Sequence, residues 1–301
     1  MKLPFLQHTG IGIHLGSRGI RWVELSRIRH KIFIRQSAFQ AVVNGDFKTA
    51  LCELVDRMRP SNPYVTANLN PADVHQIVLE VPFHDDEEEL GEWLANAPGK
   101  LLPEDASLEE FAVCHYLYGD PEEAQNCLFV MARKEAVEAR IELLYSAGLH
   151  PVILTTGDLE AGYGMMFDRN FIAAHALLIK SFENRGCLLE YQKGLLVGFH
   201  AFPEAEDAIE LIEEAHSMFA SSSGYLDGEA GGQIYLASEQ ILNHSMSDMK
   251  PGIRIRELNP LSHLTFNNEI LSPGLAVACG MAVKQLYPGL DTINMLEAAC
   301  V

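Results

Sequence analysis

Basic residues are scarce in this chain of 301 residues: 22 Lys and Arg stand against 41 Asp and Glu, which gives a net charge of −19. Nucleic-acid binding and adhesion to an anionic membrane both need a basic face, so the charge balance argues against these two functions. A local basic patch near the N-terminus remains an alternative to a solvated strand face, which is the simpler interpretation. The patch would comprise Arg18, Arg21, Arg27, Arg29, Lys31 and Arg35.

Cysteines are few, and no two have the C-x-x-C spacing; they stand at positions 52, 114, 127, 187, 279 and 300, mostly in apolar runs. This pattern is typical of buried thiols in a reducing cytoplasm rather than of a disulfide framework or a zinc site. Long apolar runs are also missing, because the longest tract, 275–283, is too short to span a bilayer. Residues 1–9 contain one Lys and no long apolar core. We therefore expect no signal peptide, no membrane insertion and a cytoplasmic protein.

Motifs of catalysis and metal binding are missing as well. The histidines are scattered without H-x-H or H-x-x-x-H spacing, and no G-x-S-x-G nucleophile motif occurs. The glycine-rich stretch 224–232 lacks the Lys-Ser/Thr of a phosphate loop and is interpreted as a linker. The sequence therefore predicts no catalytic residue and no metal site.

A glycine hairpin opens the chain. Residues 10–26, GIGIHLGSRGIRWVELS, alternate on both sides of Gly16, Ser17, Arg18 and Gly19, which predicts two strands joined by a tight turn. Two interpretations stay open. The backbone N–H groups of such a turn can hold a phosphate, or the turn can join a plain hairpin without a ligand.

Further strands and helices follow in two similar series. In the first, alternation predicts strands at 31–39, 64–69, 74–83, 111–118, 127–133 and 150–154, and helical spacing predicts helices at 47–58, 134–147 and 159–167, with an acidic helix start at 85–89. In the second, strands are predicted at 176–179, 186–191, 195–199, 233–236 and 249–258, and helices at 205–220 and 275–286. The repeated order indicates two related halves.

This layout is that of an α/β, actin-like (ribonuclease H-like) two-domain fold. We expect residues 1–172 to form the first domain, with an inserted small α+β subdomain at about 72–133. Residues 173–301 would form the second domain, the closing helix and a C-terminal tail.

Four segments in this order resemble the PilM-like family, the actin-like cytoplasmic proteins of type IV pilus assembly, which are related to MshI and to the cytoplasmic domain of GspL. The segments are GIHLGSRGIRWVELS, VPFHDDEEELGEWLANAPGKLLP, FVMARKEAVEARIELLYSAGLHPV and LSPGLAVACGMAVK. They extend over most of the chain. The resemblance implies a nucleotide site between two phosphate hairpins, at Gly16, Ser17, Arg18 and Gly19 and at Lys180 and Ser181.

The chain departs from the family where ATP would bind. His14 stands in place of an acidic residue, and Lys180, Ser181 and Phe182 replace an Asp-x-Gly hairpin. The adenosine strand ends in Ala237 and Ser238 instead of a glycine pair, and a helical subdomain after Phe199 is expected to be missing, which would reduce the wall of the second domain. These changes predict a pseudo-ATPase with vestigial phosphate loops, no required cofactor and at most weak ATP binding.

The tail contains one further candidate site. Ile293, Asn294, Met295 and Leu296 resemble the Ile-Asn-Leu-Leu-Pro segment with which PilN, a membrane protein, docks onto PilM. The tail is therefore expected either to dock on its own or a neighbouring molecule, through apolar side chains and Asn hydrogen bonds, or to be an ordinary C-terminal turn.

The resemblance implies a cytoplasmic scaffold of a type IV pilus or type II secretion machine. It would bind the N-terminal peptide of a PilN-like inner-membrane protein between its first domain and the inserted unit. Self-association is a second candidate interaction. The alternative is an ATP-binding or slowly hydrolysing ATPase of the same machinery. A division adaptor resembling FtsA is disfavoured, because no basic amphipathic helix that could anchor it follows the closing helix.

Overall fold

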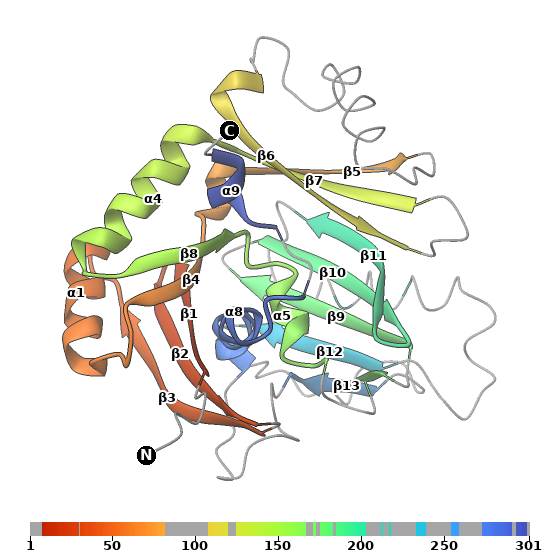
Figure 1. Cartoon of the computed structure of the whole chain (residues 1–301). Helices are drawn as coiled ribbons and strands as arrows, with labels where there is room; N and C mark the ends of the chain where they lie inside the picture. Colours follow the sequence, from red (N-terminus) through yellow and green to blue (C-terminus); the bar gives the residue numbers. More distant parts are fainter. Residues whose placement is uncertain are drawn as a thin grey trace.

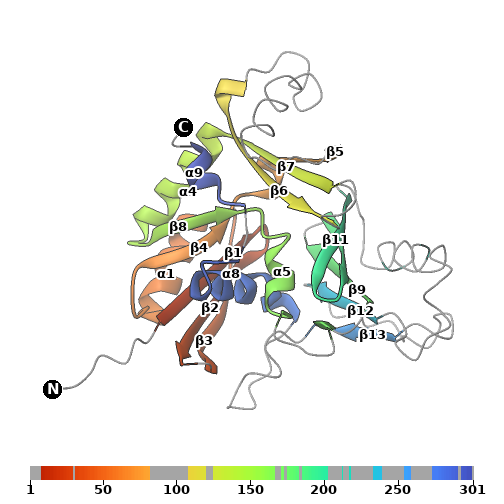
Figure 2. The same cartoon turned by 45° about the vertical axis from the view of Figure 1, so that its right-hand side comes forward.

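The computed structural model describes residues 8–29, 31–81, 108–119, 125–166, 171–172, 175–182, 185–202, 212, 217, 233–238, 254–258, 273–290 and 293–299. In this part of the chain two five-stranded sheets face each other across a central helix. A three-stranded sheet lies over one end of both (Figures 1 and 2).

The first sheet has the strand order β3-β2-β1-β4-β8. Its strands are β1 (His8–Gly16), β2 (Gly19–Ile28), β3 (Lys31–Ala41), β4 (Tyr64–Asn68) and β8 (His150–Thr155). The first three form an antiparallel meander, whereas β4 is parallel to β1 and β8 is parallel to β4. The predicted strands of this half are therefore present, with ends that differ by one or two residues.

The second sheet repeats this arrangement in the order β11-β10-β9-β12-β13. Its strands are β9 (His175–Phe182), β10 (Arg185–Gln192), β11 (Leu195–Phe202), β12 (Gln233–Ser238) and β13 (Arg254–Glu257). Again three antiparallel strands are followed by two parallel ones. Because the two orders match strand for strand, the predicted relation between the halves is confirmed.

The third sheet is inserted in the sequence between β4 and β8 and has the order β5-β7-β6. It comprises β5 (Val74–Val81), β6 (Phe111–Tyr118) and β7 (Gln125–Arg133), all antiparallel, with short 3₁₀ turns η1 (Pro71–Asp73) and η2 (Leu108–Glu110) before β5 and β6. The acidic run at 85–89 lies outside the described residues. Of the predicted helix at 205–220 only residues 212 and 217 are described, so the predicted reduction of the second domain's wall after Phe199 also lies outside the described residues.

Two helices cover the outer side of the first sheet. They are α1 (Phe47–Met58), which Asp46 caps by accepting from the Thr49 N–H at 3.0 Å, and α4 (Lys134–Ser146). The helix predicted at 159–167 is wrong in length, because α5 spans only Glu160–Tyr163. Packing favours glycine at position 162, because a Cβ there would lie 2.1 Å from the Tyr191 hydroxyl. Glycine also has a low helix propensity.

The central helix α8 (Ala276–Leu286) follows the turn η4 (Pro273–Leu275) and packs on β1, β2, β4 and α5. Its small residues and a glycine of β1 allow this close approach, since a Cβ on Gly12 would lie 1.9 Å from the Ala278 carbonyl oxygen. The side chain of Gln285 also accepts the Ile11 N–H at 2.6 Å. The first glycines of the opening stretch therefore serve helix packing. Among the described helices, none has the length and apolar character needed to cross a membrane.

The basic residues of the first strands do not form one solvated face. Arg21 is buried, with its guanidinium 5.2 Å from the ring centroid of Phe39. Arg27 donates to the Leu286 carbonyl at 2.9 Å and lies over the ring of Tyr287. The interpretation as a solvated face is thus wrong for Arg21, because β2 is an inner strand covered by neighbouring elements.

The described cysteines are all free thiols. Cys127, Cys187 and Cys279 are buried, which agrees with the predicted buried thiols, whereas Cys52 and Cys114 are partly exposed.

Candidate functional site

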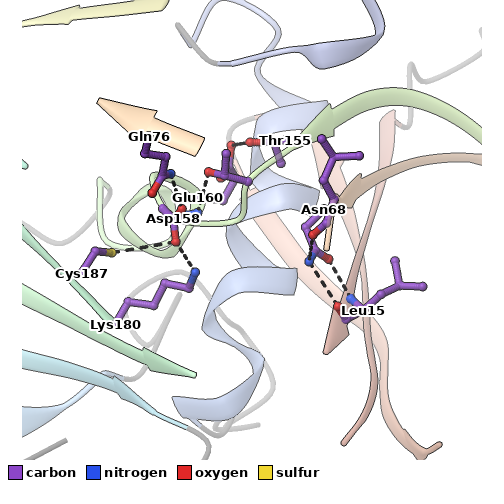
Figure 3. Close-up of polar contacts among 10 residues, drawn as sticks. Leu15, Asn68, Gln76, Thr155, Asp158, Glu160, Lys180 and Cys187 are labelled. Atoms are coloured by element: carbon purple, nitrogen blue, oxygen red, sulfur yellow. Dashed lines mark hydrogen bonds and ion pairs between the residues drawn. The ribbon is translucent and has the colours of Figure 1, made fainter. Parts of the chain in front are cut away.

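The glycine turn at residues 16–19 joins β1 to β2. Gly16 pairs with Gly19, so Ser17 and Arg18 form a two-residue turn and both are exposed. Asn68, at the end of β4, accepts the Leu15 N–H at 2.7 Å and donates to the Leu15 carbonyl at 3.2 Å, which fixes the strand before the turn (Figure 3). A Cβ on Gly19 would lie 2.7 Å from the backbone oxygen of Gln40 in β3, which cannot move aside as a side chain could. Packing against β3 alone therefore requires glycine at position 19.

Lys180 lies on β9 and is buried, and its ammonium forms an ion pair with the carboxylate of Asp158. Asp158 belongs to the segment between β8 and α5. Its other carboxylate oxygen accepts from the Gln76 side-chain amide at 2.6 Å, and the Cys187 sulfur lies 4.0 Å from the oxygen that faces Lys180 (Figure 3). We call these four residues, Gln76, Asp158, Lys180 and Cys187, the Asp158 cluster.

The Asp158 cluster joins all three sheets. Gln76 comes from β5 of the inserted sheet, Lys180 and Cys187 come from β9 and β10 of the second sheet, and Asp158 follows β8 of the first. The side chains of Lys180 and Asp158 are 9% and 16% exposed, so little water screens their attraction. One carboxylate is thus an electrostatic link between parts that lie far apart in the sequence.

The charges of this region shift the pKa values of its members. Burial is the largest single effect and would lower the pKa of the Lys180 ammonium, but the charge and hydrogen bond of Asp158, together with Cys187 and Glu160, outweigh it and raise that pKa above its ordinary value. Burial and the Asp158 charge together raise the pKa of the Cys187 thiol. Burial lowers the pKa of His14 well below its ordinary value, and the charges of Arg21 and Lys180 add to this effect. His14 is therefore neutral at physiological pH, and it lies within the electrostatic range of Lys180.

The segment that carries Asp158 is held by its own side chains. The Asp158 N–H donates to the Thr156 hydroxyl at 3.2 Å, and the Thr155 hydroxyl donates to the buried carboxylate of Glu160 at 2.6 Å. Within the described residues, no group of three or more His, Cys, Asp and Glu side chains is placed to hold a metal ion.

The two predicted phosphate loops lie on different sheets. Ser181 follows Lys180 on β9 and pairs with Gly186 of β10 and Ser238 of β12. Among the predicted loop residues, Lys180 forms the ion pair with Asp158 that links two of the sheets.

The predicted tail site lies against its own chain. Ile293 and Met295 have no exposed surface, and the short helix α9 (Met295–Ala299) contacts β6, β8 and α4 (Figures 1 and 2). The side-chain oxygen of Asn294 accepts the Leu154 N–H at 3.2 Å, and its backbone carbonyl accepts from the Cys114 thiol at 3.3 Å. Leu296 is partly buried. The segment therefore packs on its own chain, against β6, β8 and α4.

Sequence reasoning missed Asp158 and Gln76. A usable signal was present, because the sequence T-T-G-D-L-E places an acid directly after β8, at the carboxyl end of a parallel strand, where α/β folds gather functional residues. Gln76 had no such signal, since an isolated glutamine in an inserted strand is ordinary.

No family model matches the sequence, and no curated protein matches it either. Among solved structures, a chain of the PilM-PilN type IV pilus biogenesis complex superposes with a TM-score of 0.70 at 16% identity, covering 93% of this chain and 99% of that chain. A Bacteroides thetaiotaomicron protein with an actin-like ATPase fold and unknown function gives a TM-score of 0.50 at 10% identity, covering 86% of this chain and 94% of that one. The cytoplasmic domain of EpsL, from the type II secretion system of Vibrio cholerae, gives 0.48 at 13% identity, with 96% and 98% covered.

The first two of these likenesses establish the fold. The chain has the actin-like ATPase fold, with mixed α/β sheets in two related halves, and the predicted fold class is confirmed.

Proposed function

We propose that this protein is a scaffold of a type IV pilus or type II secretion machine, held beside the inner membrane by a PilN-like partner. One observation carries this proposal: the fold matches a chain of the PilM-PilN complex over 99% of that chain's length. The match includes 93% of this chain, so most of the inserted sheet lies within the matched part.

The partner's contact would be a short peptide that binds between the first sheet and the inserted sheet. Two edge strands border this place: β8 ends the order of the first sheet, β6 ends the order of the inserted sheet, and α9 contacts both. Edge strands carry unpaired backbone groups that an added segment can satisfy, which is a common way to recognise peptides.

The same proposal makes the protein a pseudo-ATPase. Mg²⁺ prefers oxygen ligands, yet Lys180 presents an ammonium where the family resemblance implies a metal carboxylate, and this ammonium already neutralises Asp158. The neighbouring Asp158 oxygen is engaged by Gln76. The donor set of these residues therefore does not fit a magnesium ion, and the Lys180 ammonium supplies the positive charge in its place.

Calorimetric titration of the protein with Mg-ATP tests this part. We expect no saturable heat up to about 1 mM nucleotide, because Lys180 and Gln76 already engage the Asp158 carboxylate, which is then not available to hold a hydrated metal ion. The alternative, an active ATPase, is favoured by the retained Gly16, Ser17 and Gly19 and by Lys180, whose ammonium can in chemical terms contact a phosphate. Saturable binding at about 100 µM or tighter would favour that alternative.

A pull-down tests the partner. The N-terminal cytoplasmic peptide of the PilN-like protein from the same organism, immobilised on beads, is expected to retain the full-length chain. A scrambled peptide of the same composition is the control, because it keeps the charge and apolar content but loses their order. Equal retention by both peptides, or by neither, would contradict the proposed contact.

A further inference from the structure

The tail segment 293–299 covers the place where the first sheet and the inserted sheet meet. In Figures 1 and 2 helix α9 lies beside α4 and between β6 and β8. Helix α9 contacts all three of these elements. Ile293 and Met295 are fully buried there, while Leu296 and the two alanines of α9 are partly buried against the same core. The segment is thus anchored mainly by two apolar side chains.

Asn294 stands between these anchors and ties the segment to both sheets. Its side-chain oxygen accepts the N–H of Leu154 on β8, and its backbone oxygen accepts the thiol of Cys114 on β6. The same side chain also accepts the Leu296 N–H at 3.3 Å and donates to Glu297 at 2.9 Å, so it caps the helix that follows. The apolar–Asn–apolar order is therefore what this surface recognises.

The segment has the geometry of a bound peptide rather than of a core element. Within the described residues it adds no strand to either sheet, and Asn294 makes the hydrogen bonds that tie it to β6 and β8. A segment held by two apolar anchors and two hydrogen bonds can open locally at a much smaller free energy than global unfolding.

We propose that the surface formed by β6, β8 and α4 is a peptide-docking surface that the chain's own tail occupies, and that a partner segment with the apolar–Asn–apolar order displaces this tail. The inference rests on the proposed function for the identity of the partner. The surface itself is assigned from the tail's contacts. Partner binding is then a competition between an external segment and an internal one, and the tethered tail raises the apparent Kd of the partner segment.

Cys114 reports whether the tail is docked. Burial raises the pKa of its thiol to about 11, and the thiol donates to Asn294. Few thiolates form at neutral pH, so alkylation is slow while the tail covers this thiol. Cys52 on α1 is partly exposed, and its thiol donates to the Ser146 carbonyl at the end of α4. In Figure 1 α1 lies at the end of α4 that is away from α9, so Cys52 provides an internal standard.

The test uses the full chain with Cys300→Ser and a protease site inserted after Gly289, a position with open space around it. The probe is a fluorescent peptide with the sequence of residues 290–301. We expect the peptide to bind the cut chain, once its own tail has been washed away, at least 10-fold more tightly than the uncut chain. Iodoacetamide should alkylate Cys114 at least 10-fold faster after tail removal, and excess peptide should slow it again. An Asn294→Ala peptide should bind about 10-fold more weakly.

Several results would overturn the proposal. A cut chain that keeps its circular dichroism spectrum but binds no peptide has no docking surface, and equal binding to cut and uncut chains shows no competition. Where removal of the tail unfolds the protein, the uncut Asn294→Ala chain replaces it. Its Cys114 should react at least threefold faster than the unsubstituted chain's, and an unchanged rate counts against a tail that opens locally.

A second probe separates this inference from the proposed function. If the tail peptide binds and the PilN-like peptide does not, the docking surface is supported and the PilN-like partner of the proposed function is excluded. Equal binding of the PilN-like peptide to cut and uncut chains supports the proposed function and overturns the displacement of the tail.

Discussion

Replacing Lys180 with methionine is expected to destabilise the protein by about 3–5 kcal/mol. The loss arises because the Asp158 carboxylate, 16% exposed, would keep its charge without the ammonium that neutralises it. Gln76 would remain as a hydrogen-bond donor to the carboxylate, but a neutral amide does not compensate a buried charge. The midpoint of urea unfolding, followed by circular dichroism, measures the effect.

A double-substitution cycle isolates the ion pair. Lys180→Met with Asp158→Asn removes both charges, and the asparagine can still accept from Gln76, so this variant should lose less than the sum of the two single variants. Lys48→Met on the exposed start of α1 is the matched control, with an expected change within about 0.5 kcal/mol. If Lys180→Met were as stable as Lys48→Met, the ion pair would not link the sheets energetically.

The same pair has a defined pH dependence. Because the pKa of Lys180 is higher in the folded protein than in the unfolded chain, its contribution to stability is complete below the unfolded value of about 10.4. The contribution is lost only as the pH rises through the raised folded value. The stability difference between the unsubstituted protein and Lys180→Met should thus stay constant from neutral pH to about pH 10 and shrink above that.

Replacing Gly280 with alanine should destabilise the protein by about 3 kcal/mol, although alanine is the better helix former by about 1 kcal/mol. Gly280 lies in the middle of α8, where a Cβ would be 1.6 Å from the backbone oxygen of Glu160 in α5. Backbone atoms on both sides cannot move as a flexible side chain could, so steric overlap outweighs helix propensity. Thermal unfolding of the variant beside the unsubstituted protein measures the loss.

Gly289→Ala is the control for this second substitution. It makes the same chemical change after the end of α8, at a position where a Cβ meets nothing within 4 Å. Its stability should change by no more than about 0.5 kcal/mol. Similar melting temperatures for the two alanine variants would show that α5 and α8 can separate without cost.

The strands of this fold were predictable because their residues alternate in apolar and polar character. The helix at 47–58 was predicted with its observed ends, since Asp46 caps it and Pro60 follows it. Burial of Arg21 was not predictable, because alternation shows which residues share a face but not which neighbour covers that face. The helix at 159–167 was predicted too long, because the apolar spacing continues to Met166 whereas α5 ends at Tyr163, with Gly164 as its C-cap.

The candidate site was predicted only in part. Lys180 was found because it departs from a family pattern, but its partner Asp158 lies 22 residues earlier and Gln76 a further 82 before that partner. Contacts over such separations depend on how three sheets meet, which no local pattern encodes. The tail motif was recognised from its residues, whereas its docking on its own chain required the surface that β6, β8 and α4 form together.

The packing of α8 also has a consequence for the order of events during synthesis. The hydrogen bond between Ile11 and Gln285 spans 274 residues, and α8 covers strands that are made well before it. The first sheet therefore leaves the ribosome long before the helix that covers it, and its inner face is exposed for most of that interval. Contacts of such long range fold slowly and leave apolar surface open to aggregation. The nascent chain should accordingly depend on chaperones until α8 has emerged.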